Sequence, residues 1–127
     1  MHGEDPLDTA RRELAEETGL AAAEWSVLVD VAPSPGFSDE AVRVYLARDL
    51  TEVGRPEPAD DEEADLATRW VPLPVAVRMV LSGTIVNATT VAGVLAAHVL
   101  SGAPTAARPA DAPWPDRPTR FAHRATR

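Results

Sequence analysis

A cluster of three acidic side chains near the start of the chain is the first feature that suggests chemistry. Glu13 directly follows Arg12, and Glu16 and Glu17 come four and five positions after that arginine. If this segment is helical, side chains three and four positions apart lie about 5–6 Å from one another, and like charges at that spacing repel. One compensating partner is Arg12, which would form a surface ion pair with Glu16. The other is a divalent cation, because Mg²⁺ takes carboxylate oxygens as ligands.

The same segment carries the start and stop signals of one helix. Asp5 can accept a hydrogen bond from the first turn, and Pro6 suits the first helical position. Gly19 suits the left-handed turn that commonly follows a helix, so the helix is expected to end near Thr18. With 3.6 residues per turn, Leu7, Ala10 and Leu14 share one face of this helix, and the glutamates cluster along another.

The order of residues from Glu4 to Leu20, EDPLDTARRELAEETGL, resembles the signature of the Nudix hydrolases. That signature reads G-x5-E-x7-R-E-U-x-E-E-x-G-U, where U is a bulky aliphatic residue. All eight specified positions from Glu4 onward match. The resemblance implies an α/β fold of the Nudix type, an α/β/α sandwich with a mixed sheet.

The resemblance also implies roles for individual residues. Glu13 and Glu17, with Glu16, would hold Mg²⁺ or Mn²⁺ against a pyrophosphate, and Arg12 would orient a glutamate rather than contact the substrate. The activity implied is hydrolysis of a nucleoside diphosphate linked to another group.

The first glycine of the signature would fall six positions before Glu4, upstream of Met1. We therefore expect residues 1–101 to be the C-terminal part of a Nudix domain, followed by a Pro- and Arg-rich tail at 102–127. A second interpretation remains open, in which the chain is a non-catalytic binding module or a fragment without activity of its own.

A turn-rich loop at 33–40 follows the expected helix and strand. Its Pro and Gly residues fit a plain hairpin turn. The loop also resembles that of the ADP-ribose pyrophosphatases within the Nudix family, which favours ADP-ribose as substrate. The resemblance makes six of its residues candidates for substrate binding: Ser34, Pro35, Gly36, Phe37, Ser38 and Glu40.

A second acidic segment at 57–65 has two interpretations. Runs of acidic residues are most often solvated loop charge. In ADP-ribose pyrophosphatases, however, a loop ahead of a strand carries the glutamate that deprotonates the attacking water. That resemblance places Glu62 in the role of general base, with Glu63 as the close alternative.

The composition excludes several classes of function. The formal net charge of −8 argues against a nucleic-acid partner, since phosphate backbones are bound by basic surfaces. The absence of cysteine excludes disulfides and thiolate metal sites. No apolar run is long enough to span a bilayer, so we expect a soluble, cytoplasmic protein without a membrane partner. The resemblance implies a homodimer in the full-length form.

Apolar patterning predicts the remaining elements. Strands are expected at 25–32, 41–48 and 66–71, with a long polar connection over 49–67. Helices are expected at 73–83 and 89–100, the second capped by Thr84 or Asn87, and both are expected to cover the sheet. In the tail, Trp114 is expected to anchor the chain against either its own body or a second subunit.

Overall fold

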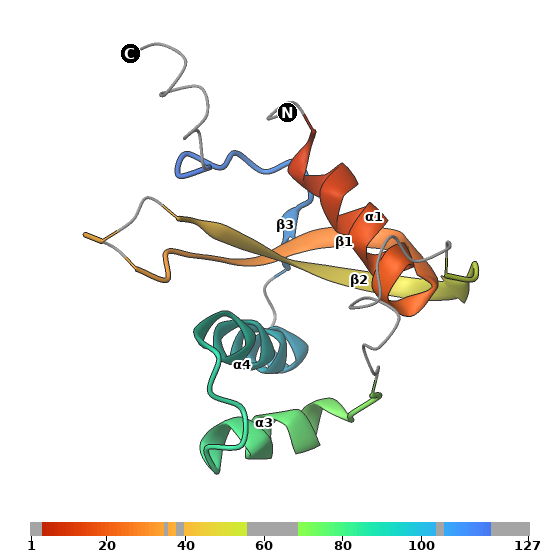
Figure 1. Ribbon diagram of the computed structural model, residues 1–127. Coiled ribbons are helices and arrows are strands. Elements are labelled where there is room, and N and C mark those ends of the chain that lie inside the picture. Colours follow the sequence, from red (N-terminus) through yellow and green to blue (C-terminus); the bar gives the residue numbers. More distant parts are fainter. Residues whose placement is uncertain (1–3, 35, 38–39, 56–68, 104–105, 118–127) are drawn as a thin grey trace. The chain divides into compact units, whose positions relative to one another are not determined.

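A computed structural model describes residues 4–34, 36–37, 40–55, 69–103 and 106–117. The elements occur in the order α1 (Pro6–Thr18), β1 (Leu20–Val31), β2 (Val42–Glu52), α3 (Leu73–Leu81), α4 (Ala88–Gly102) and β3 (Arg108–Pro109), as Figure 1 shows. The expected α/β class is confirmed.

The chain divides into two compact units. The first consists mainly of Gly3–Trp25 with Ala47–Trp70, and the second mainly of Ser26–Leu46 with Val71–Arg127. Strands β1 and β2 each contribute residues to both units. Helix α1 belongs to the first unit, whereas α3, α4 and β3 belong to the second.

Helix α1 begins and ends where its terminal residues predict. The Asp5 carboxylate accepts a hydrogen bond of 2.9 Å from the backbone N–H of Leu7. At the other end Gly19 has a left-handed φ of 74°, and its N–H donates to the carbonyl of Ala15 at 2.9 Å. These contacts satisfy backbone groups that a helix leaves unpaired at its ends. The helix expected from the sequence is confirmed at both termini.

Strands β1 and β2 are longer than the apolar pattern predicts. β1 begins at Leu20, directly after the capping glycine, rather than at Trp25. Alanines at the start of β1 have low strand propensity, and pairing within the sheet overrides it. β2 continues to Glu52, so the polar connection expected over 49–67 is wrong for its first four residues.

The third expected strand, at 66–71, is not found where the structure can test it. Residues 69–71 are not in a strand, and residues 66–68 lie outside the described residues. The prediction rested on a few β-branched and aromatic side chains in a very short run, which is a weak signal on its own.

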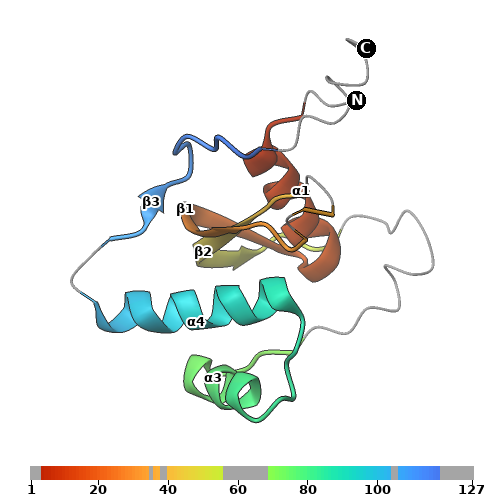
Figure 2. The same ribbon diagram turned by 90° about the vertical axis from the view of Figure 1, so that its left-hand side faces the viewer.

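Both helices of the second unit form where the sequence predicts them. Asn87 caps α4, since its side-chain oxygen accepts a hydrogen bond of 3.1 Å from the backbone N–H of Thr90. The two helices pack against each other, and α4 lies between α3 and the strands in Figure 2. The expectation that a helix covers the sheet is thus confirmed for α4, while α3 packs along α4. Within the described residues, no helix combines the length and apolar character needed to cross a membrane.

The contact between α4 and the sheet depends on a small residue. A Cβ atom added at Gly93 would lie 3.2 Å from Cγ1 of Val44 on β2, which is closer than most such contacts. A larger residue at this position would therefore require the Val44 side chain or the helix to shift by a few tenths of an ångström. In the same unit Val27, on β1, is 1% exposed and is the most deeply buried apolar side chain among the described residues.

The C-terminal segment adds a strand that the sequence does not predict. β3 pairs antiparallel with β1, with Ser26 opposite Pro109 and Val27 opposite Arg108. The sheet order is β2-β1-β3. A two-residue strand is too short to show alternation of apolar and polar residues. Proline, which β3 contains, is found in sheets mainly on edge strands. No local pattern could therefore have revealed it.

An ion-pair network holds this region of the sheet. Arg43 on β2 has a side chain only 3% exposed, and it donates to both carboxylate oxygens of Asp30 on β1, at 2.7 and 3.0 Å. Arg108 on β3 donates to the same carboxylate at 3.1 Å. Asp30 thus links β1 to both β2 and β3. The bidentate pairing of Arg43 with Asp30 matches the planar fork of the guanidinium.

Arg43 also binds the residues that follow β3. Its guanidinium donates to the backbone carbonyls of Ala112 at 2.7 Å and Pro113 at 3.0 Å. The Trp114 ring lies beneath it, with the ring centroid 4.9 Å from Cζ, within the range of a cation–π contact. Of the two positions expected for Trp114, the structure shows the one against the body of the chain.

The network predicts a specific dependence of stability on pH. Hydrogen bonds from Arg43, and then from Arg108, hold the pKa of Asp30 below its ordinary value. A carboxylate with a depressed pKa adds stability above its unfolded pKa, about 3.9, and that stability is lost as the pH falls through the folded pKa. The difference in unfolding free energy between the wild type and Asp30→Asn should therefore shrink below about pH 4. Urea unfolding at several pH values measures it, and a difference constant from pH 7 to pH 2 would contradict the assignment.

Candidate functional site

Helix α1 exposes its acidic residues more than its leucines. Glu13 and Glu17 are exposed, whereas the Glu16 side chain is 30% exposed. Leu7 and Leu14 are half-buried. The helix is therefore amphipathic, as expected, and its exposed side carries the carboxylates that the sequence singles out.

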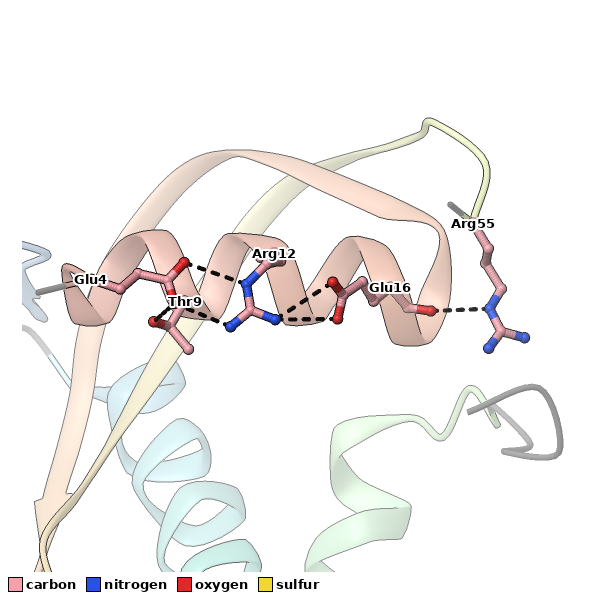
Figure 3. Close-up of polar contacts among 5 residues, drawn as sticks. All are labelled: Glu4, Thr9, Arg12, Glu16 and Arg55. Carbon is pink, nitrogen blue, oxygen red and sulfur yellow. Dashed lines mark hydrogen bonds and ion pairs between the residues drawn. The ribbon is translucent and has the colours of Figure 1, made fainter. Parts of the chain in front are cut away.

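Arg12 joins two carboxylates, one just before this helix and one on it (Figure 3). It donates to Glu4 through Nη2 at 3.1 Å and Nε at 3.3 Å, and to Glu16 through Nη1 at 3.3 Å. Thr9 donates its hydroxyl to Glu4 at 2.8 Å. The expected pairing of Arg12 with Glu16 is observed. Thr9 was not predicted to take part, and nothing in its spacing distinguishes it from other helical threonines.

Each charged group in this network shifts the pKa of its partner toward the charged form. The hydrogen bond from Arg12, followed by that from Thr9, lowers the pKa of Glu4. The carboxylate of Glu4, and then that of Glu16, raises the pKa of Arg12. Both groups therefore remain charged across the neutral range, and Arg12 forms an ion pair with Glu16 one turn along the helix.

A second arginine contacts the C-terminal end of α1. Arg55, which follows β2, donates from Nε to the backbone carbonyl of Glu16 at 3.1 Å (Figure 3). The backbone N–H of Val53 donates to the carbonyl of Gly19 at 2.9 Å. Sequence reasoning missed both contacts, because they join residues more than thirty positions apart and follow no repeating pattern.

The donor set of α1 fits a hard divalent cation by its chemistry. Glu13, Glu16 and Glu17 supply only carboxylate oxygens, which Mg²⁺ and Mn²⁺ prefer over softer ligands. In the described part of the chain, no three acidic or histidine side chains already converge as a ligand set. Binding would therefore require exposed glutamate side chains to change rotamer, a small cost for side chains at a surface.

The loop between β1 and β2 is described in part. The N–H of Phe37 donates to the carbonyl of Ser34 at 3.1 Å, which closes a turn, and Gly36 within it has a φ of 88°. The Phe37 side chain is 96% exposed, and Glu40 is exposed as well. Pro35 and Ser38 lie outside the described residues, as do Glu62 and Glu63 of the acidic segment. An exposed aromatic ring beside a turn is available to contact a ligand.

Comparison with known proteins identifies a common family for most of the chain. The NUDIX domain matches residues 1–90. The chain is 57% identical over 122 residues, or 96% of its length, to the ADP-ribose pyrophosphatase of Mycobacterium tuberculosis. It is 38% identical over 88 residues, or 69% of its length, to the ADP-ribose pyrophosphatase of Bacillus subtilis. It is 37% identical over 100 residues, or 79% of its length, to the CMP-5'-(N-acetyl-N-hydroxy-3-aminopropyl)phosphonate hydrolase of Streptomyces rubellomurinus.

These relatives are longer than the chain. It spans 58% of the Mycobacterium tuberculosis protein and 47% of each of the other two.

Proposed function

Because the chain belongs to the NUDIX family, we propose that it hydrolyses the pyrophosphate bond of ADP-ribose, or of a related nucleoside diphosphate sugar, to AMP and ribose 5-phosphate. The observation that carries this proposal is the 57% identity to a named ADP-ribose pyrophosphatase over 96% of the chain. The acidic side of α1 supports it, since a pyrophosphate is bound through cations rather than through carboxylates directly. A homodimer of the full-length protein remains a prediction.

We further propose Glu13 and Glu17, with Glu16, as the ligands of Mg²⁺ or Mn²⁺. When bound, the cation would neutralise the diphosphate and act as a Lewis acid toward it. The residues of the chain then have separate tasks. Arg12 holds Glu16 in place through the ion pair of 3.3 Å, and Glu4 in turn holds Arg12 at 3.1 Å. Phe37 stays a candidate for substrate binding on sequence resemblance alone.

The experiment that tests this function is incubation of the chain with ADP-ribose, with Mg²⁺ or with a chelator, followed by chromatography of the products. We expect AMP and ribose 5-phosphate in equal amounts, and no product with the chelator. Binding of ADP-ribose without product would favour the binding-module interpretation instead. UDP- and GDP-linked sugars, assayed in parallel, establish which base the chain accepts.

The general base is proposed on sequence grounds alone. We expect Glu62→Gln to lower kcat by about a hundredfold, because general base catalysis contributes roughly 10²–10⁴ in rate. The affinity for Mn²⁺, measured by electron paramagnetic resonance, should stay unchanged. Glu63→Gln is the matched control, one position away. If Glu63→Gln is the damaging change, the base is Glu63.

A further inference from the structure

The C-terminal turn of α1 carries negative side chains at the negative end of the helix dipole, and no basic residue of that turn compensates for them. A helix dipole places partial negative charge at its C-terminus, where acidic side chains are unfavourable and basic ones are favourable. Here the last turn contains Glu16 and Glu17 and no basic residue. The turn that carries two of the proposed metal ligands therefore needs positive charge, and a partner for its carbonyls, from elsewhere in the chain.

Arg55 supplies both. Its Nε donates to the carbonyl of Glu16 at 3.1 Å, so one of the otherwise unpaired carbonyls of the helix is satisfied (Figure 3). Its guanidinium places a positive charge at the negative end of the helix dipole. Glu16 is thus held at both ends, at its carboxylate by Arg12 at 3.3 Å and at its backbone carbonyl by Arg55.

The backbone around Arg55 is fitted closely against the same turn. A Cβ atom added at Gly19 would lie 3.1 Å from Cγ of Arg55 and 3.2 Å from its backbone N. The N–H of Val53 donates to the carbonyl of Gly19 at 2.9 Å. Segment 53–55 is therefore joined to the end of the helix by two hydrogen bonds, and it lies so close to Gly19 that a side chain there would be crowded.

We propose that Arg55 is a positioning residue for the metal ligands of α1. It fixes the backbone of the last turn of the helix, from which the side chains of Glu16 and Glu17 extend. The proposal rests on the proposed function, because it assumes that these glutamates hold a metal ion. Arg55 acts through the helix backbone and need not touch the cation or the substrate.

The expected effect follows from how supporting residues act in metal sites. Removing a group that orients a ligand typically lowers metal affinity or activity by about 10–100-fold. Without Arg55, the last turn of α1 has to be ordered when the cation binds, and that ordering opposes binding. We therefore expect Arg55→Met to raise the dissociation constant for Mn²⁺ about tenfold. We expect kcat to fall while KM for ADP-ribose stays near the wild-type value.

Three variants of the full chain test the proposal. Arg55→Met removes the charge and the hydrogen bond. Arg55→Lys keeps the charge without the guanidinium fork, and should recover part of the Mn²⁺ affinity. Arg78→Met is the matched control, since Arg78 is an exposed arginine on α3, in the second unit. Mn²⁺ binding is measured by electron paramagnetic resonance, and amide hydrogen exchange is followed over residues 15–20 without metal.

The outcomes separate this proposal from the proposed function. Faster exchange over residues 15–20 with weaker Mn²⁺ binding in Arg55→Met, and neither change in Arg78→Met, supports it. Unchanged Mn²⁺ affinity in Arg55→Met overturns it while leaving the proposed function intact. A wild-type chain that binds no Mn²⁺ removes the proposed function itself. If Arg55→Met does not fold, Arg55→Lys is the deciding variant. Wild-type Mn²⁺ affinity and wild-type amide exchange in Arg55→Lys would show that the guanidinium fork has no positioning role.

Discussion

Replacing Glu17 by glutamine is expected to lower kcat for ADP-ribose by about a thousandfold or more. Glutamine has nearly the same shape as glutamate but carries no charge, so the variant loses one anionic ligand of the proposed metal site. Stabilisation by a bound metal ion contributes several kcal/mol to catalysis, and each 1.36 kcal/mol is worth about a tenfold change in rate. Because Glu17 is exposed on α1, unfolding free energy should change by less than about 0.5 kcal/mol.

The measurement pairs steady-state kinetics with Mn²⁺ binding and urea unfolding. Glu24→Gln is the matched control, because Glu24 is an exposed glutamate on β1 in the same unit and outside the signature. We expect the control to keep its turnover. A near-wild-type rate in Glu17→Gln would remove Glu17 from the metal site, and a large loss of stability would mean that its role is structural.

The Arg43→Met change is expected to lower unfolding free energy by about 3–5 kcal/mol. The guanidinium is 3% exposed and is bound to the Asp30 carboxylate. It also binds the carbonyls of Ala112 and Pro113. Methionine fills a similar volume but donates no hydrogen bond, so the carboxylate and both carbonyls would lose their buried partner. The segment after β3 should then detach from the sheet before the rest of the unit unfolds.

Urea unfolding and limited proteolysis measure the two parts of this prediction. We expect early cleavage within residues 106–117 in Arg43→Met and none in the wild type at the same protease concentration. Arg43→Lys should fall between them, because lysine keeps the charge but has three N–H donors on one atom and cannot replace the four hydrogen bonds of the guanidinium. Arg78→Met is again the control. Equal stability of Arg43→Met and the wild type would show that packing alone holds the segment.

Local signals in the sequence predicted the elements whose causes are local. Asp5, Pro6 and Gly19 each act within one turn of α1, and the structure places both helix ends at the residues expected. The same holds for Asn87 at the start of α4. Caps depend on a few neighbouring residues, so their effect can be read without knowing the fold.

The features that the sequence did not reveal depend on distant partners. Arg43 alternates with apolar residues on β2, a pattern equally typical of a solvent-exposed arginine. It is buried only because residues 112–114, about 70 positions later, cover it. β3 and the early start of β1 likewise result from pairing between strands, which overrides local propensity.

In the candidate site, too, the local contacts could be predicted from the sequence and the long-range ones could not. The spacing of Arg12 and Glu16 predicted their ion pair, because both lie on one helix. The second partner of Arg12, at Glu4, lies before the helix, and the pattern gave it no role beyond the signature. Arg55 reaches the helix from the end of β2, so only the three-dimensional arrangement assigns it to the site.

The attachment of residues 106–117 bears on how the protein should be prepared. Composition alone suggests ending the expressed protein at residue 101, in order to remove a Pro-rich extension. That deletion would also remove β3 and three contacts of Arg43, and would leave its charge facing a single carboxylate at an uncovered sheet edge. Trimming for crystallisation, or a C-terminal purification tag, should therefore leave this segment intact.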